Sequence, residues 1–128
     1  MLEVEIIGAQ HAPDAPVEAE IERLLALALA SADVLDGHVA VEFVEALRIA
    51  ELNEQHRGKE GPTDVLSFPI DEDGVPAGPR ELGDIVICPG HTEDLREAIV
   101  HGALHLVGMD HEADDGEMLA LQAEILSW

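Results

Sequence analysis

Three histidines close together in the sequence carry the strongest chemical signal in this chain. His101, His105 and His111 lie within residues 101–111, and the whole chain has only seven histidines. The first two are four residues apart, so on a helix they lie one turn apart on the same face. Gly108 can end that helix and let the chain reverse toward His111. Three neutral imidazoles and one open position are typical of a catalytic zinc site, so we predict one Zn²⁺ per chain. The weaker alternative to a metal site is that these are ordinary core or surface histidines whose spacing arose by chance.

The spacing His105-x-x-Gly108-x-x-His111 is that of the metzincin proteases, with one difference. In those enzymes a glutamate that activates water directly follows the first histidine of the motif. Here that position is Gly102. The sequence therefore predicts metal ligands without the protease's base, which favours a reaction whose base is the metal-bound hydroxide or comes from elsewhere. Asp110 either orients a ligand imidazole or is a turn residue, and the sequence favours neither.

Length and composition indicate one soluble domain spanning residues 1–128. The hydrophobic content of 47% excludes a disordered acidic tail. We expect neither a signal peptide nor a membrane helix, because no apolar run approaches the roughly 20 residues that a membrane span needs. Cys88 is the only cysteine, which excludes an internal disulfide. These features favour a cytoplasmic location.

The chain is strongly acidic, with 28 Asp and Glu against six Lys and Arg and a formal net charge of −22. Such a chain repels nucleic acid at long range and depends on local positive charge to bind it. Adaptation to a salty cell interior is one interpretation. A simply solvated acidic surface is the alternative that we favour.

Hydrophobic periodicity predicts an α+β fold in which a small mixed sheet of about four strands packs against helices. The three-histidine zinc site would lie at the end of one helix. We expect strands at 2–7, 38–44, 65–68 and 83–88. Helices are expected at about 16–31 and 46–55, between 92 and 108, and after a capping box at 114–117, with Asp14 and Thr92 as caps of the first and third.

A second informative stretch contains Arg57 and Lys59, which flank Gly58 where a helix is expected to end. The pair could bind a phosphate, and the forked guanidinium of arginine suits bidentate contact better than lysine does. Alternatively, the two cations offset the dipole at the end of the helix, which spacing alone favours. Asn53 is more readily explained as structural on local evidence.

Four motifs together resemble the YbeY family of bacterial endoribonucleases, which are also described as rRNA maturation factors. The resemblance covers about residues 38–126, with the motifs in the family's order. They are Asn53…Arg57-Gly58-Lys59, Pro62-Thr63-Asp64-Val65-Leu66-Ser67-Phe68-Pro69, Leu82-Gly83-Asp84-Ile85-Val86-Ile87 and His101-Gly102-x-Leu104-His105-Leu106-x-Gly108-x-Asp110-His111.

This resemblance implies a zinc-dependent hydrolase of single-stranded RNA that acts in 16S rRNA 3′-end maturation and ribosome quality control. Arg57 would meet the scissile phosphate, with Lys59 and Ser67 as further substrate contacts, which favours the phosphate interpretation of Arg57. The partners implied are a 16S rRNA precursor, the ribosome and small-subunit assembly proteins, with no membrane and no DNA. Either hydroxide or the ribose 2′-OH could be the nucleophile. The segment from Cys88 to Val100 is shorter than is usual in the family, so an extra helical segment should be reduced or absent.

Three other functions stay open at this point. The chain could be a metal-dependent hydrolase of another substrate. A minimal metalloprotease is disfavoured by Gly102. A ribosome-assembly factor without nuclease activity would carry a structural zinc with a fourth protein ligand, such as His91 or Asp110.

Overall fold

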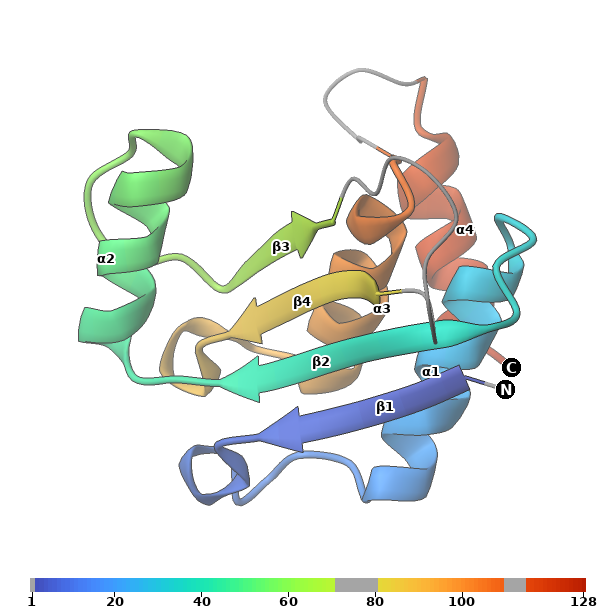
Figure 1. Cartoon of the computed structure of the whole chain (residues 1–128), viewed down its shortest axis with the longest axis horizontal. Coiled ribbons are helices and arrows are strands. Elements are labelled where there is room, and N and C mark those ends of the chain that lie inside the picture. Colours follow the sequence, from blue (N-terminus) through green and yellow to red (C-terminus); the bar gives the residue numbers. More distant parts are fainter. Residues whose placement is uncertain (1, 71–80, 110–114) are drawn as a thin grey trace.

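A four-stranded mixed sheet forms the centre of the structure, a computed structural model in which residues 2–70, 81–109 and 115–128 are described. Its strands are β1 (Leu2–Ile7), β2 (Gly37–Phe43), β3 (Val65–Pro69) and β4 (Glu81–Ile87). They lie in the order β1-β2-β4-β3 (Figure 1). β1, β2 and β4 run parallel, and β3 runs antiparallel to β4 at one edge. The α+β class and the four expected strands are confirmed.

Four α-helices accompany this sheet in the described residues: α1 (Glu18–Ala30), α2 (Ala46–Arg57), α3 (Leu95–Leu106) and α4 (Glu117–Leu126). α1, α3 and α4 pack against one another on one side, whereas α2 stands apart at the left of Figure 1. Short 3₁₀ turns occur at Ala9–His11 and Pro89–His91, and the second is the only helical element between β4 and α3. Within the described ranges, no helix combines the length and hydropathy that crossing a bilayer requires.

The helix that carries the first two histidines begins at a different cap from the one expected. Asp94, not Thr92, is the N-cap of α3, and its carboxylate accepts hydrogen bonds from the backbone N–H groups of Arg96 (3.0 Å) and Glu97 (3.2 Å). The Thr92 hydroxyl instead donates to the Cys88 carbonyl at 2.7 Å, inside the preceding turn. Both side chains are good caps, and the tight turn after β4 decides which one reaches the first helical turn.

Two other expected caps also differ from the structure. Asp14 does not cap α1, which begins after Val17 with no side-chain cap. α4 begins at Glu117 with Gly116 as its N-cap and again has no side-chain cap. Asp114, the first residue of the expected capping box, lies outside the described residues.

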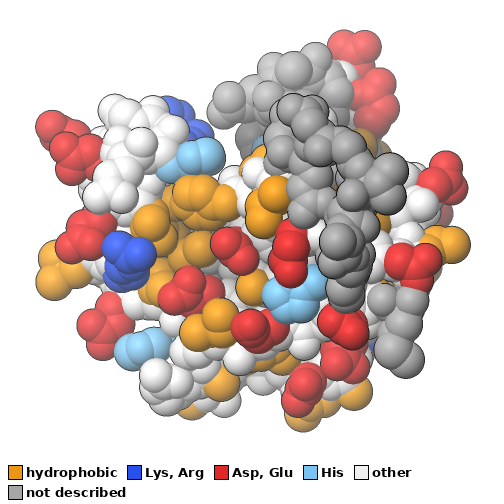
Figure 2. All heavy atoms as spheres, in the orientation of Figure 1, with side chains coloured by type: hydrophobic (Ala, Val, Ile, Leu, Met, Phe, Trp, Pro, Cys, Tyr) orange, Lys and Arg blue, Asp and Glu red, His pale blue; other side chains and the backbone are white. Residues whose placement is uncertain are grey.

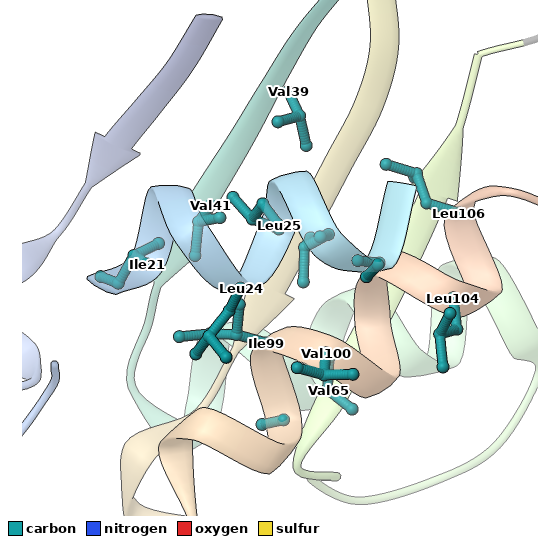
Figure 3. Close-up of a cluster of buried hydrophobic side chains, with 14 of the residues drawn as sticks. Ile21, Leu24, Leu25, Val39, Val41, Val65, Ile99, Val100, Leu104 and Leu106 are labelled. Atoms are coloured by element: carbon teal, nitrogen blue, oxygen red, sulfur yellow. The ribbon is translucent and has the colours of Figure 1, made fainter. Parts of the chain in front are cut away.

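The larger hydrophobic core lies between the sheet and the helices α1, α3 and α4. Helices and strands both contribute fully buried aliphatic side chains to it (Figure 3), among them Leu24, Leu25, Val39, Val41, Ile99, Val100 and Leu104. Burial of this kind contributes roughly 1.5–3 kcal/mol per large side chain. The core therefore holds α3, with its histidines, firmly on the sheet.

A smaller cluster on the opposite face of the sheet anchors α2. Ile49 from α2 packs with Leu66, Val86 and Cys88. Successive side chains of a strand point to opposite faces, so β3 serves both layers. Its odd-numbered residues face α3, and its even-numbered residues face α2.

Gly102 sets how closely α3 approaches the sheet. A Cβ built at this buried position would lie 2.5 Å from Cγ2 of Ile85 and 3.2 Å from Cγ2 of Val65. Both neighbours are β-branched side chains, which are stiff at χ1 and cannot turn aside easily. A glutamate after His101, as in the metzincins, therefore has no room in this fold.

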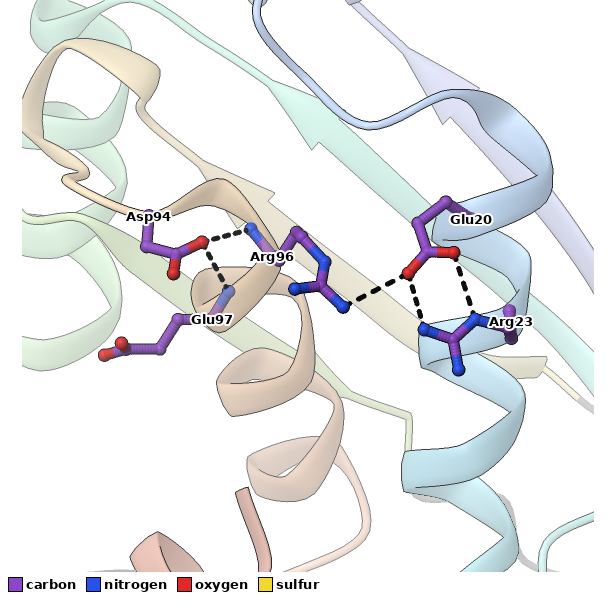
Figure 4. Close-up of polar contacts among 5 residues, drawn as sticks. All are labelled: Glu20, Arg23, Asp94, Arg96 and Glu97. Carbon is purple, nitrogen blue, oxygen red and sulfur yellow. Dashed lines mark hydrogen bonds and ion pairs between the residues drawn. The ribbon is translucent and has the colours of Figure 1, made fainter. Parts of the chain in front are cut away.

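An ion-pair network fixes the start of α3 against α1 (Figure 4). The Glu20 carboxylate accepts hydrogen bonds from Arg23 at 2.7 and 3.0 Å and from Arg96 of α3 at 3.3 Å. The hydrogen bond from Arg23, together with the charges of both guanidiniums, lowers the pKa of Glu20.

We predict that Gly102→Ala destabilises the protein. The better helix propensity of alanine contributes about 1 kcal/mol, but overpacking costs roughly 1–3 kcal/mol, so a net loss of about 1 kcal/mol is expected. Urea denaturation measures it. Gly90→Ala is the matched control, because a Cβ there meets nothing within 4 Å. Equal stability of the two variants would contradict the close approach.

We also predict that Glu20→Gln lowers the urea midpoint at neutral pH, because the neutral amide loses both ion pairs. A carboxyl group with a lowered folded pKa stabilises the fold above its unfolded pKa of about 4.3. That stabilisation is lost as the pH falls through the folded value. The difference between wild type and variant should therefore shrink below about pH 4. Glu22→Gln on the exposed side of α1 is the control, and a pH-independent difference would contradict the role of the ion pairs.

Candidate active site

A cleft of about 430 Å³ brings together residues from α2, β3 and α3. Figure 2 shows cationic and histidine side chains at the C-terminal end of α2, beside a group of hydrophobic side chains. The lining residues are His56, Arg57, Asp64, Val65, Leu66, Ser67, His101, His105, Gly108 and Met109. Two of the predicted metal ligands and two of the three predicted substrate-binding residues therefore share one cleft.

The two helical histidines face each other across one turn of α3. Their Nε2 atoms are 3.1 Å apart. The Nδ1 atom of His101 lies 2.8 Å from Oε1 of Gln122, and Nδ1 of His105 lies 2.9 Å from the carbonyl oxygen of Met109. Both of these oxygens are acceptors, so each Nδ1 carries the proton and donates it. In the neutral imidazoles, the Nε2 lone pairs therefore converge.

Converging Nε2 lone pairs fit a divalent metal ion. A tetrahedral zinc with Zn–N bonds of about 2.0–2.1 Å holds two nitrogen ligands roughly 3.3 Å apart. The observed separation of 3.1 Å is close to that value. Acceptors on the remote ring nitrogen are the usual way in which proteins fix the tautomer of a ligand histidine. His101 and His105 are thus oriented as metal ligands would be.

The third predicted ligand cannot be placed. His111, and Asp110 beside it, lie outside the described residues. Among the residues that are described, no group of three metal-binding side chains is found. His91, considered as a fourth ligand, lines a neighbouring groove that also includes His101. The three-histidine zinc site accordingly stays a prediction.

Arg57 is the last residue of α2, and its position in the cleft follows from how the helix ends. Gly58 is the C-cap with φ of 68°, a left-handed conformation that glycine adopts readily. Arg57 is exposed and lines the cleft, whereas Lys59 is exposed but is not among the lining residues.

The positive charge of Arg57 is not neutralised within the described part of the chain. The other described arginines, Arg23, Arg48 and Arg96, all form ion pairs with glutamates there. Neither Arg57 nor Lys59 has an ion pair among the described residues. In a chain with 28 acidic residues, an arginine left unpaired in a cleft is available for an anionic ligand.

Ser67 lines the cleft, but its side chain is engaged within the protein. The hydroxyl donates to the Gly102 carbonyl at 2.7 Å and so ties β3 to α3. Asn53 is buried and donates through Nδ2 to the Gly61 carbonyl at 2.9 Å, which agrees with its structural interpretation.

Sequence reasoning did not identify Gln122 or His56 as site residues. Gln122 is only 7% exposed and belongs to the inward stripe of α4 with Met118 and Ile125. An amide in a buried helical stripe is itself a signal, because a buried polar group needs a partner. His56 lines the cleft, and its ring lies 4.4 Å from that of Phe68. Nothing in the sequence around His56 indicated that it would line the cleft.

Comparison with known proteins shows the family to which this chain is similar. The family model described as Endoribonuclease YbeY matches residues 7–128. Endoribonuclease YbeY of Corynebacterium glutamicum is 40% identical over 127 residues, covering 81% of this chain and 65% of the relative. The relatives in Salinispora tropica and Geobacillus kaustophilus, with the same name, are 37% and 44% identical. These alignments cover 95% and 84% of this chain, and 96% and 83% of the relatives.

A solved structure has the same fold. The solution structure of TM1509 from Thermotoga maritima is 30% identical, with a TM-score of 0.53, and the match covers 97% of this chain and 87% of that one. The chain spans 61–65% of the length of the corynebacterial relatives but nearly all of the Salinispora protein. Since the family model matches almost the whole sequence, the chain belongs to the Endoribonuclease YbeY family.

Proposed function

We propose that this protein is a zinc-dependent endoribonuclease that cuts single-stranded RNA, acting in 16S rRNA 3′-end maturation and ribosome quality control. One observation carries the nuclease proposal: two imidazoles with converging lone pairs and an unpaired arginine line the same cleft. Phosphodiester hydrolysis needs these two elements, a site that generates a nucleophile and a cation for the phosphate. The role in rRNA maturation is proposed from the family resemblance.

The metal-binding residues in this proposal are His101, His105 and His111, with one zinc per chain. Held there, zinc acts as a Lewis acid that lowers the pKa of water toward neutrality. Gln122 and the Met109 carbonyl hold the protons of His101 and His105 on Nδ1, so that both Nε2 atoms are ready to bind metal. The missing glutamate at position 102 removes the base of the metalloproteases, which favours a phosphodiester over a peptide substrate.

Arg57 binds the scissile phosphate and offsets the negative charge that grows on it in the transition state. The Gly58 cap places Arg57 at the end of α2, from where its forked guanidinium can make bidentate contact. Single-stranded RNA suits the cleft because an unpaired strand can present its backbone to a narrow site, whereas a duplex cannot. The ribosome and small-subunit assembly proteins are the proposed partners.

We predict that Arg57→Ala and His105→Ala both strongly impair cleavage, but for different reasons. Cleavage is measured on a single-stranded RNA that carries a 16S rRNA 3′ end, and zinc is measured on each preparation. Arg57→Ala should keep its zinc and lose about 100- to 1,000-fold in kcat/KM, the usual cost of removing one transition-state contact. His105→Ala should lose the zinc itself.

Arg48→Ala is the matched control, because Arg48 lies on the same helix and is exposed outside the cleft. It should cleave as wild type does, which would show that general loss of positive charge is not the cause. Wild type that binds zinc but cuts no RNA would overturn the nuclease proposal and favour an assembly factor or a hydrolase of another substrate. Wild type without zinc would overturn the metal role.

We further predict that Gln122→Leu weakens zinc binding about 10- to 100-fold, the usual effect of losing the partner of a ligand histidine. Without the amide acceptor, the His101 ring is free to rotate and to carry its proton on Nε2. Competition with a chelator measures the affinity, and thermal melting checks the fold. Leu119→Ala, an exposed substitution one turn earlier on α4, is the control. Unchanged affinity in a folded Gln122→Leu protein would show that Gln122 has no such role.

A further inference from the structure

The edge strand β3 exposes main-chain groups beside the candidate active site. β3 lies at the end of the strand order β1-β2-β4-β3, so one of its two sides has no neighbouring strand in the described structure (Figure 1). Asp64, Val65, Leu66 and Ser67 line the cleft from this strand and from the residue before it. The polar groups on the open side of β3 are therefore next to the histidines and Arg57.

The register of the sheet determines which main-chain groups point outward. Cys88 N–H donates to the Asp64 carbonyl (2.8 Å), and Ile70 N–H donates to the Leu82 carbonyl (3.3 Å). In an antiparallel pair, hydrogen-bonded and non-hydrogen-bonded residues alternate. Residues 64, 66, 68 and 70 therefore use their main-chain groups toward β4. Those of Val65, Ser67 and Pro69 point to the open side.

The open side offers more acceptors than donors. The Val65 N–H already donates to Oδ1 of Asp64 at 2.8 Å. Pro69 has no N–H at all. Among the described residues, the carbonyls of Val65 and Ser67 and the N–H of Ser67 have no partner. Along three successive outward residues, only one N–H donor is available.

This imbalance distinguishes the possible occupants. An extended peptide that adds a strand needs both donors and acceptors along the edge. Two of the donors are missing here, because Pro69 has no N–H and the Val65 N–H is already hydrogen-bonded. Single-stranded DNA offers few donors from its backbone, because its phosphates accept only and its sugar has no 2′-hydroxyl. RNA carries one 2′-hydroxyl donor per nucleotide, which is the group that distinguishes RNA from DNA.

We propose that the open side of β3 is a ribose-binding subsite that selects RNA. The carbonyls of Val65 and Ser67 accept hydrogen bonds from ribose 2′-hydroxyls, and the Ser67 N–H donates to an oxygen of the same backbone. Bound in this way, the strand runs along β3 with its phosphate between Arg57 and the histidines. The subsite rests on the proposed function, since it supplies the selectivity of that reaction.

The test compares an RNA oligonucleotide with DNA of the same sequence on the wild-type protein. Metal is removed with a chelator, so that the RNA stays intact. Carbonyl and amide chemical shifts of β3 are followed by NMR during the titration. RNA should change the carbonyl chemical shifts of Val65 and Ser67, and DNA should change them much less. The carbonyls of Leu66 and Phe68, which bond to β4, are the internal control.

Binding of modified strands measures the contribution of each contact. A single 2′-deoxy substitution should weaken binding about 2- to 10-fold at one or two positions and not elsewhere, as expected for one lost hydrogen bond. Ser67→Pro should bind RNA more weakly than Ser67→Ala, since both lose the hydroxyl but only proline loses the N–H. The NMR titration still decides the question if the proline variant does not fold.

Each outcome supports or overturns the subsite. If RNA binds and the β3 carbonyls respond equally to RNA and DNA, the subsite is wrong while the nuclease proposal stands. If an extended peptide changes these carbonyl chemical shifts and RNA does not, the edge of β3 binds a peptide as an added strand instead. If RNA neither binds nor is cleaved, the subsite and the proposed function are both overturned.

Discussion

The close approach of α3 to the sheet determines the geometry on which the site depends. Gly102 permits this approach, and its carbonyl accepts the Ser67 hydroxyl. A side chain at position 102 would push the helix outward and carry His101 and His105 away from β3 and Arg57. The same contact excludes the glutamate of the related protease motif. One packing constraint thus fixes the positions of the histidines and also restricts the chemistry available to them.

The proposed binding of RNA by so acidic a protein has to rely on directed contacts rather than on general attraction. The formal net charge is −22, so long-range electrostatics oppose the approach of a polyanion. Within the described residues, the cleft has one unpaired arginine and an edge of main-chain carbonyls. Hydrogen bonds to sugar hydroxyls are insensitive to net charge, whereas phosphate contacts weaken as salt increases. A hydroxyl-based subsite would therefore compensate for the scarcity of cations.

The sequence predicted the elements well because the hydrophobic periodicity is strong, and it located the histidine pair because helical spacing places residues i and i+4 on one face. It could not predict Gln122 as the partner of His101, because that contact depends on how α4 packs on α3. Asp94 and Thr92 are both suitable caps by residue type, and the turn after β4 decides which of them caps α3. The third ligand, His111, stays a prediction made from its spacing and from the family resemblance.

The contribution of α4 has a consequence for the timing of activity during synthesis. The strands, Arg57 and both helical histidines are all made before Gln122, because the amide that orients His101 comes from α4, which follows them in the chain. A nascent chain still lacking α4 would leave His101 without that acceptor and the hydrophobic core without Met118 and Ile125. A growing chain from which α4 has not yet emerged would thus be poorly competent for metal binding. If the protein is the nuclease proposed above, such a delay would keep an incomplete chain from cutting RNA.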